Sequence, residues 1–308
     1  MKIYASLDDL PKKPIEPVAT MGNFDGIHRG HQAILARLKQ ESQRKGVPTM
    51  VITFNPHPHQ VFRPDEQFSP IMNIKERLRR LWHLGIDHAL VLPFTPDLYE
   101  MSAHEFTEEI LWERLRVTAM YVGPYVRYGQ GREGDLRMLE SHGRQFGFTV
   151  GVVDPVSIQK RRVSSTLIRK LIESGNLEGT VRLLGRHHTL VGEVIKGDGR
   201  GRTIGVPTAN IAMDGTILPP AGVYAAWVRC EDESRWPAAV NLGRRPTFGD
   251  VGSAIEAHLI GYKGDLYGQE IFISLVEHIR PEIAFPDAQT LKIQIKRDIK
   301  ETKRILGV

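Results

Sequence analysis

The chain has 308 residues, of which 41% are hydrophobic and 25% are charged, which is ordinary for a globular protein with two sizeable cores. Its single cysteine, Cys230, excludes a disulfide framework and a thiolate metal site. Because no segment has the apolar length of a signal peptide or a membrane span, we expect a cytoplasmic protein without a membrane partner.

The formal net charge of +5 is a mild basic excess, which suits a small polyanion such as a nucleotide. A nucleic-acid surface would gather lysine and arginine in a stripe with aromatic residues between them. The basic clusters here are short: Arg77, Arg79 and Arg80, and Lys160, Arg161 and Arg162. We therefore expect each cluster to be a solvated face, and no nucleic-acid partner.

The first half of the chain alternates continuous apolar runs with amphipathic helical patterns. The runs are Val18–Met21, Thr49–Phe54, His88–Pro93, Thr118–Val122 and Phe148–Val153. Two capping patterns each predict the start of a helix: Asn73 with Glu76, and Ser102 with Glu105. Strands and helices in alternation favour a doubly wound parallel sheet, which binds ligands at the carboxyl ends of its strands.

The stretch Gly22–His31, GNFDGIHRGH, follows the first of these strands and opens a helical pattern that runs to Gly46. Gly22 and Gly26 permit a tight turn, after which the helix start presents backbone N–H groups to an anion. His28 and His31 are three residues apart and share one face of that helix end. A phosphate chain would meet both, although a plain glycine turn with a half-buried histidine pair would give the same spacing.

A second helix end of this kind lies in Val163–Ile172. Ser164, Ser165 and Thr166 occupy the cap of an apolar helical pattern, and Arg169 lies in its first turns. Hydroxyls, amide donors and a guanidinium together suit phosphate, although an ordinary cap with a surface arginine would look similar. Two such ends in one domain are what nucleotidyl transfer from a triphosphate to a phosphate acceptor requires.

The rhythm changes after Gly185, and we place the domain boundary between residues 185 and 186. Strand candidates separated by glycine- and proline-rich turns predict a compact antiparallel barrel or sandwich. They are Leu190–Ile195, Val223–Val228, Ala238–Val240, Ile255–Ile260 and Ile271–Val276. A final helix starts near Asp287, and its stripe of Leu291, Ile295, Thr302 and Leu306 predicts a face packed on the barrel.

Two neighbouring segments of this second half suit a nucleotide and its metal. The glycine-rich loop has backbone donors and charge at Gly197, Gly199, Arg200, Gly201 and Arg202, although a mobile hairpin would look the same. Pro207 then leads into Thr208 and Asn210. Two residues apart in an extended segment, these side chains point the same way and offer oxygens that suit Mg²⁺ bound mainly through phosphates.

The first set of motifs carries a family resemblance. The segments GIHRGH (26–31) and SSTLIR (164–169) resemble the HxGH/SSTxIR nucleotidyltransferase superfamily, and TFNPHP (53–58) narrows this to the bacterial bifunctional riboflavin kinase/FAD synthetase family. The resemblance implies an HxGH-type doubly wound domain that adenylylates FMN with ATP, releasing pyrophosphate. It implies that His28 and His31 are catalytic and that Asn55 and His57 lie on the flavin side. The residues it implies at the ATP phosphates are Gly22, Asn23, Phe24, Asp25, Gly26, Gly30, Ser164, Ser165, Thr166 and Arg169.

The second half resembles the riboflavin kinase module, a β-barrel with a C-terminal helix. The matching segments are PTAN (207–210), GVY (222–224), NLGRRPTF (241–248), EAHL (256–259) and DLYG (265–268). The resemblance implies Mg²⁺-dependent phosphorylation of riboflavin to FMN by ATP, with Glu256 as the base and Thr208 and Asn210 as metal ligands. The alternation of Ile255, Ala257 and Leu259 agrees, because it leaves Glu256 on the opposite strand face. A surface glutamate would show the same alternation. Arg280 is a further candidate for phosphate or flavin contact.

Two alternatives stay open from the sequence. Related chains carry a VGxDFxFG-like segment where this one has Tyr125, Val126 and Tyr128, so an active kinase with a weak or degenerate adenylyltransferase is one alternative. The basic isoelectric point of about 9.3 and the likeness of HxGH to class I aminoacyl-tRNA synthetases motivate a nucleic-acid binder as the other. We expect a monomer or weak homo-oligomer whose partners are riboflavin, FMN and ATP.

Overall fold

A computed structural model describes residues 1–197, 205–213, 215–244 and 253–308 of the chain, which divides into two compact units. The N-terminal unit comprises residues 1–70 and 74–165, and the C-terminal unit comprises residues 71–73 and 166–308. The predicted boundary between the functional domains, at residues 185 and 186, stays a prediction.

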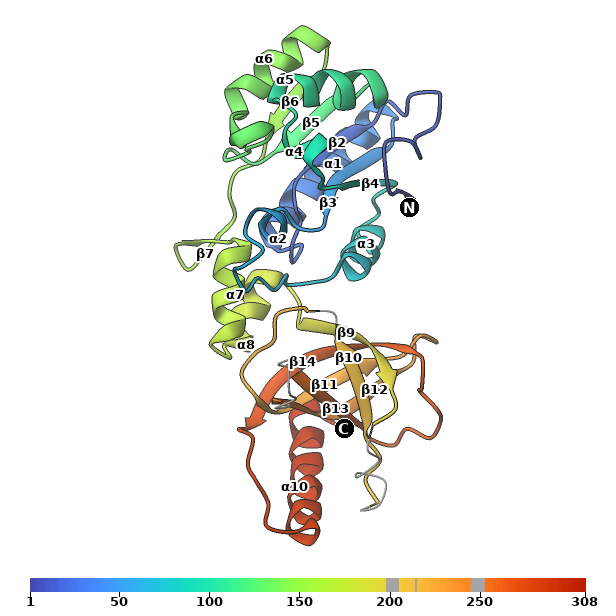
Figure 1. The fold of residues 1–308 in the computed structure, drawn as a ribbon, viewed down its shortest axis with the longest axis vertical. Helices are drawn as coiled ribbons and strands as arrows, with labels where there is room; N and C mark the ends of the chain where they lie inside the picture. Colours follow the sequence, from blue (N-terminus) through green and yellow to red (C-terminus); the bar gives the residue numbers. More distant parts are fainter. Residues whose placement is uncertain (198–204, 214, 245–252) are drawn as a thin grey trace. The chain divides into compact units, whose positions relative to one another are not determined.

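The N-terminal unit is built on a six-stranded parallel sheet with the order β1-β4-β3-β2-β5-β6 (Figure 1). Its strands are β1 (Lys2–Tyr4), β2 (Val18–Met21), β3 (Thr49–Asn55), β4 (His88–Pro93), β5 (Ala119–Val122) and β6 (Thr149–Val152). The five predicted strands are confirmed, whereas β1 was not expected. The chain order reverses between β2 and β5, and the carboxyl ends of strands at such a switch point form the ligand crevice of doubly wound sheets.

Helices connect these strands, and three of them were predicted, those that start at Gly22–His31, at Asn73 with Glu76 and at Ser102 with Glu105. They are α1 (Arg29–Lys45), α2 (Pro58–Phe62), α3 (Ile74–His83), α4 (Pro96–Tyr99), α5 (Ala103–Glu105), the π-helix η1 (Phe106–Arg114), the 3-10 helix η2 (Gln130–Arg132) and α6 (Leu136–Phe146). Helix α1 ends at Gly46, whose φ of +69° favours glycine. Ser102 and Glu105 form the predicted capping box at the start of α5.

The helical pattern after Glu105 takes a different form from the one expected. It is a π-helix, in which buried Phe106, Ile110, Leu111 and Leu115 recur at intervals of four and five residues. Bonds between residues five apart match that spacing better than the bonds between residues four apart in an α-helix. The segment thereby places all four apolar side chains in the core of the unit.

The prediction that the Arg77 cluster is a solvated face is wrong for Arg77, which is only 3% exposed. Its guanidinium donates hydrogen bonds to groups at the end of β3, which keeps it inside the unit. Arg161 and Arg162 form strand β8 (Arg161–Arg162), which pairs with β7 (Ser157–Ile158). Lys160, Arg161 and Arg162 are exposed, as expected.

The C-terminal unit is a closed antiparallel barrel with the strand order β10-β13-β12-β11-β14-β9 (Figure 1). Its strands are β9 (His188–Ile195), β10 (Ala209–Met213), β11 (Gly222–Arg229), β12 (Arg235–Arg244), β13 (Ser253–Leu259) and β14 (Glu270–Arg280). Helices α7 (Ser165–Glu173) and α8 (Leu177–Leu184) precede the barrel, and α8 was not predicted. Alternate strand residues such as Val240, Ile255 and Ile273 fill the barrel core.

The last helix, α10 (Ala288–Leu306), packs against β11, β12 and β14 of the barrel (Figure 1). Asp287 caps it by accepting a hydrogen bond from the Thr290 backbone N–H at 2.7 Å. Thr302, in the predicted stripe, is fully buried. The predicted barrel with its closing helix is confirmed.

Candidate active sites

The turn between β2 and α1 lies at the switch point of the parallel sheet. Gly22 and Gly26 have φ values of +159° and +87°, and the turn also forces Phe24 and Ile27 to φ values of +48° and +37°. A β-branched residue such as isoleucine rarely adopts this conformation, and strain of this kind gathers at binding and catalytic sites. The sequence GNFDGI is therefore held in one specific turn before the helix begins.

His28 and His31 lie together at the start of α1. Their rings stack with centroids 3.7 Å apart and 13° between planes. His28 is the N-cap, and its Nδ1 accepts a hydrogen bond from the His31 backbone N–H at 3.2 Å. In the neutral ring the proton is then on Nε2, which can donate to an anion. A Cβ on Gly30 would lie 3.1 Å from His28 Cε1, so glycine leaves the room that this ring needs.

The serine-rich segment is joined to the same turn. The Ser165 hydroxyl donates to the Asp25 carbonyl at 2.8 Å, and Asp25 itself is 1% exposed. Ser164 directly precedes helix α7, and Thr166 and Arg169 follow in its first turns. Ser165 is thus bonded to the turn within the N-terminal unit, and the roles of Ser164, Thr166 and Arg169 at phosphate stay predictions.

The segment after β5 departs from the family pattern in two different ways. Tyr125 is 66% exposed, and the Arg162 guanidinium lies 4.6 Å from its ring centroid. Tyr128 is buried, and its hydroxyl lies 3.1 Å from Nδ1 of His142. Of the two tyrosines, Tyr125 therefore presents a side chain that a ligand could reach, whereas Tyr128 belongs to the core.

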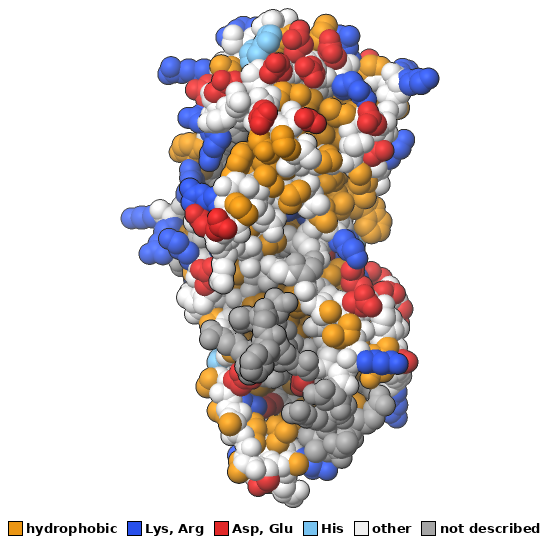
Figure 2. Space-filling model, in the orientation of Figure 1, with side chains coloured by type: hydrophobic (Ala, Val, Ile, Leu, Met, Phe, Trp, Pro, Cys, Tyr) orange, Lys and Arg blue, Asp and Glu red, His pale blue; other side chains and the backbone are white. Residues whose placement is uncertain are grey.

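An aromatic cluster that the sequence analysis missed lies beside the TFNPHP segment. Phe62 is 59% exposed and contacts Phe94 and Tyr99 at 5.4 and 5.2 Å between ring centroids, and Phe54 lies 5.7 Å from Phe94. Figure 2 shows hydrophobic side chains gathered on this side of the N-terminal unit, over α4 and β4. Phe62 is the exposed member of this cluster, whereas Phe54, Phe94 and Tyr99 are half-buried.

Asn55 and His57 flank this cluster with different local surroundings. Asn55 ends β3 and is exposed. His57 caps α2, since its Nδ1 accepts from the His59 N–H at 3.1 Å, and its ring lies 4.5 Å from that of Phe68. Their contact with flavin stays a prediction.

The barrel carries a row of polar side chains across three neighbouring strands. Asn210 on β10 is directly opposite Glu256 on β13, and Glu256 is directly opposite Asn241 on β12. Such pairs have Cβ atoms about 4.5–5.5 Å apart. The strand neighbours Ile211, Ile255 and Val240 are in the barrel core, so the three polar side chains point outward. Asn241 was not among the predicted site residues.

Residues after β9 and before β10 lie close to this row. A Cβ on Gly197 would lie 2.2 Å from Asn210 Nδ2, so only glycine lets the chain approach that amide. His258 Nδ1 lies 2.8 Å from the Pro207 carbonyl, which can only accept, so His258 donates here. Val206 is buried with 5% exposure.

The side-chain oxygens of Asn210 and Glu256 in this row, and that of Thr208 just before β10, are available to a ligand. Within the described part of the chain, the side chains of Thr208, Asn210 and Glu256 make no hydrogen bond or ion pair. Across the same ranges, no group of three His, Cys, Asp or Glu side chains could hold a metal ion. A hydroxyl and an amide oxygen suit a hard cation that keeps most of its ligands from phosphates and water, and so fit Mg²⁺.

Arg280 is engaged with the last helix. Its Nη2 lies 2.8 Å from Asp298 Oδ2, and Gln294 also donates to Asp298. Its strand neighbour Val223 stands next to Asn241 across β11 and β12, so Arg280 lies along the same barrel face as Glu256. A role for Arg280 toward phosphate or flavin stays a prediction.

Some predicted residues fall outside the described ranges. They are Gly199, Arg200, Gly201 and Arg202 of the glycine-rich loop, and residues 245–248 of the NLGRRPTF segment. None of the helices in the described ranges combines the length and the apolar composition of a bilayer-crossing helix.

Comparison with known proteins assigns each half of the chain separately. A family model described as FAD synthetase matches residues 10–167, and one described as Riboflavin kinase matches residues 184–306. Two curated relatives carry the name "Bifunctional riboflavin kinase/FMN adenylyltransferase". That of Escherichia coli (strain K12) is 36% identical over 100% of this chain and 99% of its own, and that of Pseudomonas fluorescens is 35% identical over 99% and 98%.

A solved structure also matches over nearly the whole chain. It is titled as a macrolide-efflux protein from Streptococcus pneumoniae and has a TM-score of 0.86 and 29% sequence identity. The match covers 98% of this chain and 98% of that one.

Proposed function

The chain belongs to the bifunctional riboflavin kinase/FMN adenylyltransferase family, and from this we propose how its residues divide the two reactions. The barrel half phosphorylates riboflavin to FMN with ATP, and the sheet half converts FMN and ATP to FAD and pyrophosphate. The observation that carries this division is that each family model falls on its own half of the chain, from residue 10 to 167 and from 184 to 306. We keep the functional boundary between residues 185 and 186 as part of this proposal.

The alternative of a kinase with a degenerate adenylyltransferase is not favoured. The FAD synthetase model matches the sheet half, and relatives covering the whole chain carry both activities in their names. Tyr125 therefore replaces a polar residue within a matching domain rather than marking a lost one.

For adenylyl transfer, we assign the phosphates of ATP to the turn after β2. An oxygen of the FMN phosphate attacks the α-phosphorus, the bond to the pyrophosphate oxygen breaks, and pyrophosphate leaves with its charge. The Nε2–H of His28, the stacked His31 and the N–H groups of the first turn of α1 stabilise that charge. Ser164, Thr166 and Arg169 hold the β- and γ-phosphates, and Ser165 donates to the Asp25 carbonyl.

The residues that line this cradle at the ATP phosphates are Gly22, Asn23, Phe24, Gly26 and Gly30. The flavin of FMN lies on the side of Asn55 and His57, where the cluster of Phe54, Phe62, Phe94 and Tyr99 offers planar apolar surface.

For the kinase reaction, we assign the base to Glu256. Its carboxylate accepts the proton of the ribityl 5′-hydroxyl, whose oxygen attacks the γ-phosphorus of ATP while the bond to ADP breaks. Thr208 and Asn210 hold Mg²⁺ together with the ATP phosphates, and Gly197 keeps Asn210 in place. When bound, the cation offsets the negative charge of the transferring phosphoryl group. The loop from Gly199 to Arg202 and residue Pro207 frame the nucleotide, and Arg280 contacts phosphate or flavin.

We further propose a cytoplasmic enzyme that acts as a monomer or weak homo-oligomer, with riboflavin, FMN and ATP as its only partners. The absence of a basic stripe in the sequence supports the exclusion of nucleic acid.

The product profile of the pure protein tests the whole assignment. Incubation with riboflavin, ATP and Mg²⁺, followed by separation of the flavins, should give FMN first and then FAD. Omission of Mg²⁺ with added chelator should stop FMN formation. Riboflavin that stays unchanged in the complete mixture would refute the kinase assignment, and FMN that accumulates without FAD would refute the adenylyltransferase assignment.

A further inference from the structure

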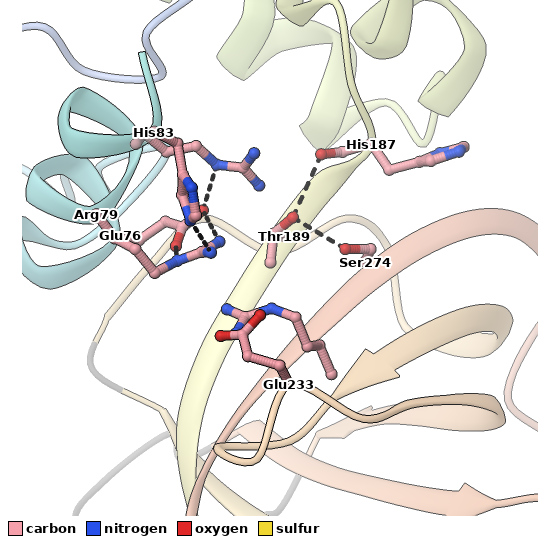
Figure 3. A network of polar contacts seen from close by, with 9 residues as sticks. Glu76, Arg79, His83, His187, Thr189, Glu233 and Ser274 are labelled. Carbon is pink, nitrogen blue, oxygen red and sulfur yellow. Dashed lines mark hydrogen bonds and ion pairs between the residues drawn. The ribbon is translucent and has the colours of Figure 1, made fainter. Parts of the chain in front are cut away.

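Arg77 differs from its neighbours on helix α3. Arg79 and Arg80 donate to Glu76 at 2.7 and 2.5 Å, and Arg79 also contacts His83, so these pairs stay within the helix (Figure 3). Arg77 makes no contact with Glu76 and is 3% exposed. Because burial of an unpaired charge is costly, a buried guanidinium requires partners elsewhere in the fold.

Those partners lie at the carboxyl end of strand β3. Arg77 Nη1 donates to the Thr53 hydroxyl and to the Phe54 carbonyl, both at 3.2 Å. The Thr53 hydroxyl in turn donates to the Asn23 carbonyl at 3.3 Å. One side chain therefore reaches the end of β3, where the flavin-side segment starts, and through Thr53 the turn after β2.

An electrostatic interaction also links Arg77 to Asp25 of the turn after β2. Burial lowers the pKa of Arg77, and the negative charge of Asp25 acts in the opposite direction. Asp25 is 1% exposed and carries the carbonyl that accepts from Ser165. Arg77 Nε is buried and has no hydrogen-bond partner in the described part of the chain, so its role is not that of a fully bonded structural ion pair.

We infer that Arg77 is a positioning residue of adenylyl transfer. It holds two segments at a fixed distance from each other: the turn after β2, which we assign to the ATP phosphates, and the end of β3, where the flavin-side segment starts. This rests on the proposed function of the N-terminal half. In-line attack by the FMN phosphate requires both substrates in one geometry, and a misplacement of about 1 Å can cost about 100-fold in rate. A single buried cation that contacts the end of β3 directly, and the turn after β2 through Thr53, sets that geometry.

Arg77→Met tests the inference, with FMN formation by the same protein as an internal control. We expect kcat/KM for FAD synthesis to fall about 100-fold, with KM rising for both ATP and FMN because both segments lose their common anchor. Arg77→Lys keeps the charge and one donor, and should recover at least tenfold of that loss. Arg80→Met removes a cation from the same helix that contacts neither segment, and should leave FAD synthesis within twofold.

Thr53→Val provides a second variant that keeps the shape of the side chain. It removes the Thr53 hydroxyl that joins Arg77 to the Asn23 carbonyl and leaves the bond from Arg77 to the Phe54 carbonyl. We expect it to raise KM for ATP more than KM for FMN. If Arg77→Met does not fold, Arg77→Lys and Thr53→Val carry the test through the same two KM values.

Three results would overturn the inference. They are FAD synthesis by Arg77→Met within threefold of the unaltered protein, equal loss of FMN and FAD formation, and a lysine variant no better than the methionine one. Failure of the unaltered protein to make FAD at all would instead refute the proposed function.

Discussion

The Ser165 hydroxyl donates a hydrogen bond to the Asp25 carbonyl at 2.8 Å and thereby joins two motifs that lie 140 residues apart in the sequence. Asp25 belongs to the strained turn before α1, and Ser165 begins α7. This hydrogen bond holds Ser165, the first residue of α7, against the strained turn.

Removal of this hydroxyl should slow FAD formation without stopping it. A hydrogen bond contributes about 0.5–1.5 kcal/mol, so we expect Ser165→Ala to lower kcat/KM for FAD synthesis about 3- to 10-fold. Ser174→Ala is the matched control, because that exposed hydroxyl donates only to the Leu171 carbonyl at the end of the same helix. Steady-state rates of FMN and FAD formation measure the effect. Unchanged FAD formation by Ser165→Ala would show that this hydrogen bond does not contribute to the reaction.

The two functions of His28 can be separated by asparagine. His28→Asn keeps an acceptor at the N-cap, where asparagine is favoured, and removes the Nε2–H that we assign to the phosphates. We expect an unchanged melting temperature and about 10²–10³-fold slower FAD synthesis. His104→Ala, an exposed histidine paired with Glu108, should affect neither. A variant that loses stability together with activity would indicate that capping is the main role of His28.

The sequence anticipated the elements that local chemistry determines. Gly46 ends α1, Ser102 and Glu105 cap α5, and apolar runs such as Val18–Met21 mark the parallel strands, because each signal lies within a few residues. The barrel strands were also expected, although β12 extends well beyond Ala238–Val240.

What the sequence did not predict depends on contacts between distant segments. Arg77 resembles any surface arginine until Thr53 and Asp25 are brought against it. The aromatic cluster combines side chains from β3, α2, α4 and the segment after β4, so no single stretch indicates it. Asn241 gains its significance only from the register of β12 on β13.

Substitution of Glu256 should slow FMN formation and leave the N-terminal reaction unchanged. We expect Glu256→Gln to slow FMN formation about 100-fold, in the range of general-base contributions, because an amide cannot accept the hydroxyl proton. FAD formation from supplied FMN should be unchanged. Glu193→Gln changes another outward-facing strand glutamate, on β9, and should have no effect on either rate. Undiminished FMN formation in Glu256→Gln would assign the base elsewhere.

A methyl group at Gly197 should act on Asn210. An added Cβ would lie 2.2 Å from Asn210 Nδ2, so Gly197→Ala must displace that amide or its own strand end. We expect FMN formation to fall about 10- to 100-fold and to require more Mg²⁺ for half-maximal rate. Gly123→Ala adds a Cβ that meets nothing within 4 Å and should leave the kinase rate unchanged. An unaltered Mg²⁺ dependence in Gly197→Ala would contradict the assignment of Asn210 as a ligand.

The buried His188 of β9 should make barrel stability fall at acid pH. Burial lowers its pKa to about 4, and its Nε2 lies 2.9 Å from the Ile217 carbonyl, so the folded barrel holds the neutral ring. Unfolding releases a histidine with a pKa of about 6.5, so the unfolded state binds more protons between pH 6.5 and 4. Stability from this group is therefore complete above pH 6.5 and declines as the pH falls toward 4.

By pH 5 the expected loss is about 2 kcal/mol relative to pH 7.5. Hydrogen exchange of peptides from β9 and β14, followed at several pH values after correction for the intrinsic exchange rate, reports this loss for the barrel alone. His188→Gln keeps a side-chain N–H donor but cannot titrate, so its barrel should lose about 2 kcal/mol less over the same interval. A variant with the same acid sensitivity as the unaltered chain would assign the effect to other groups.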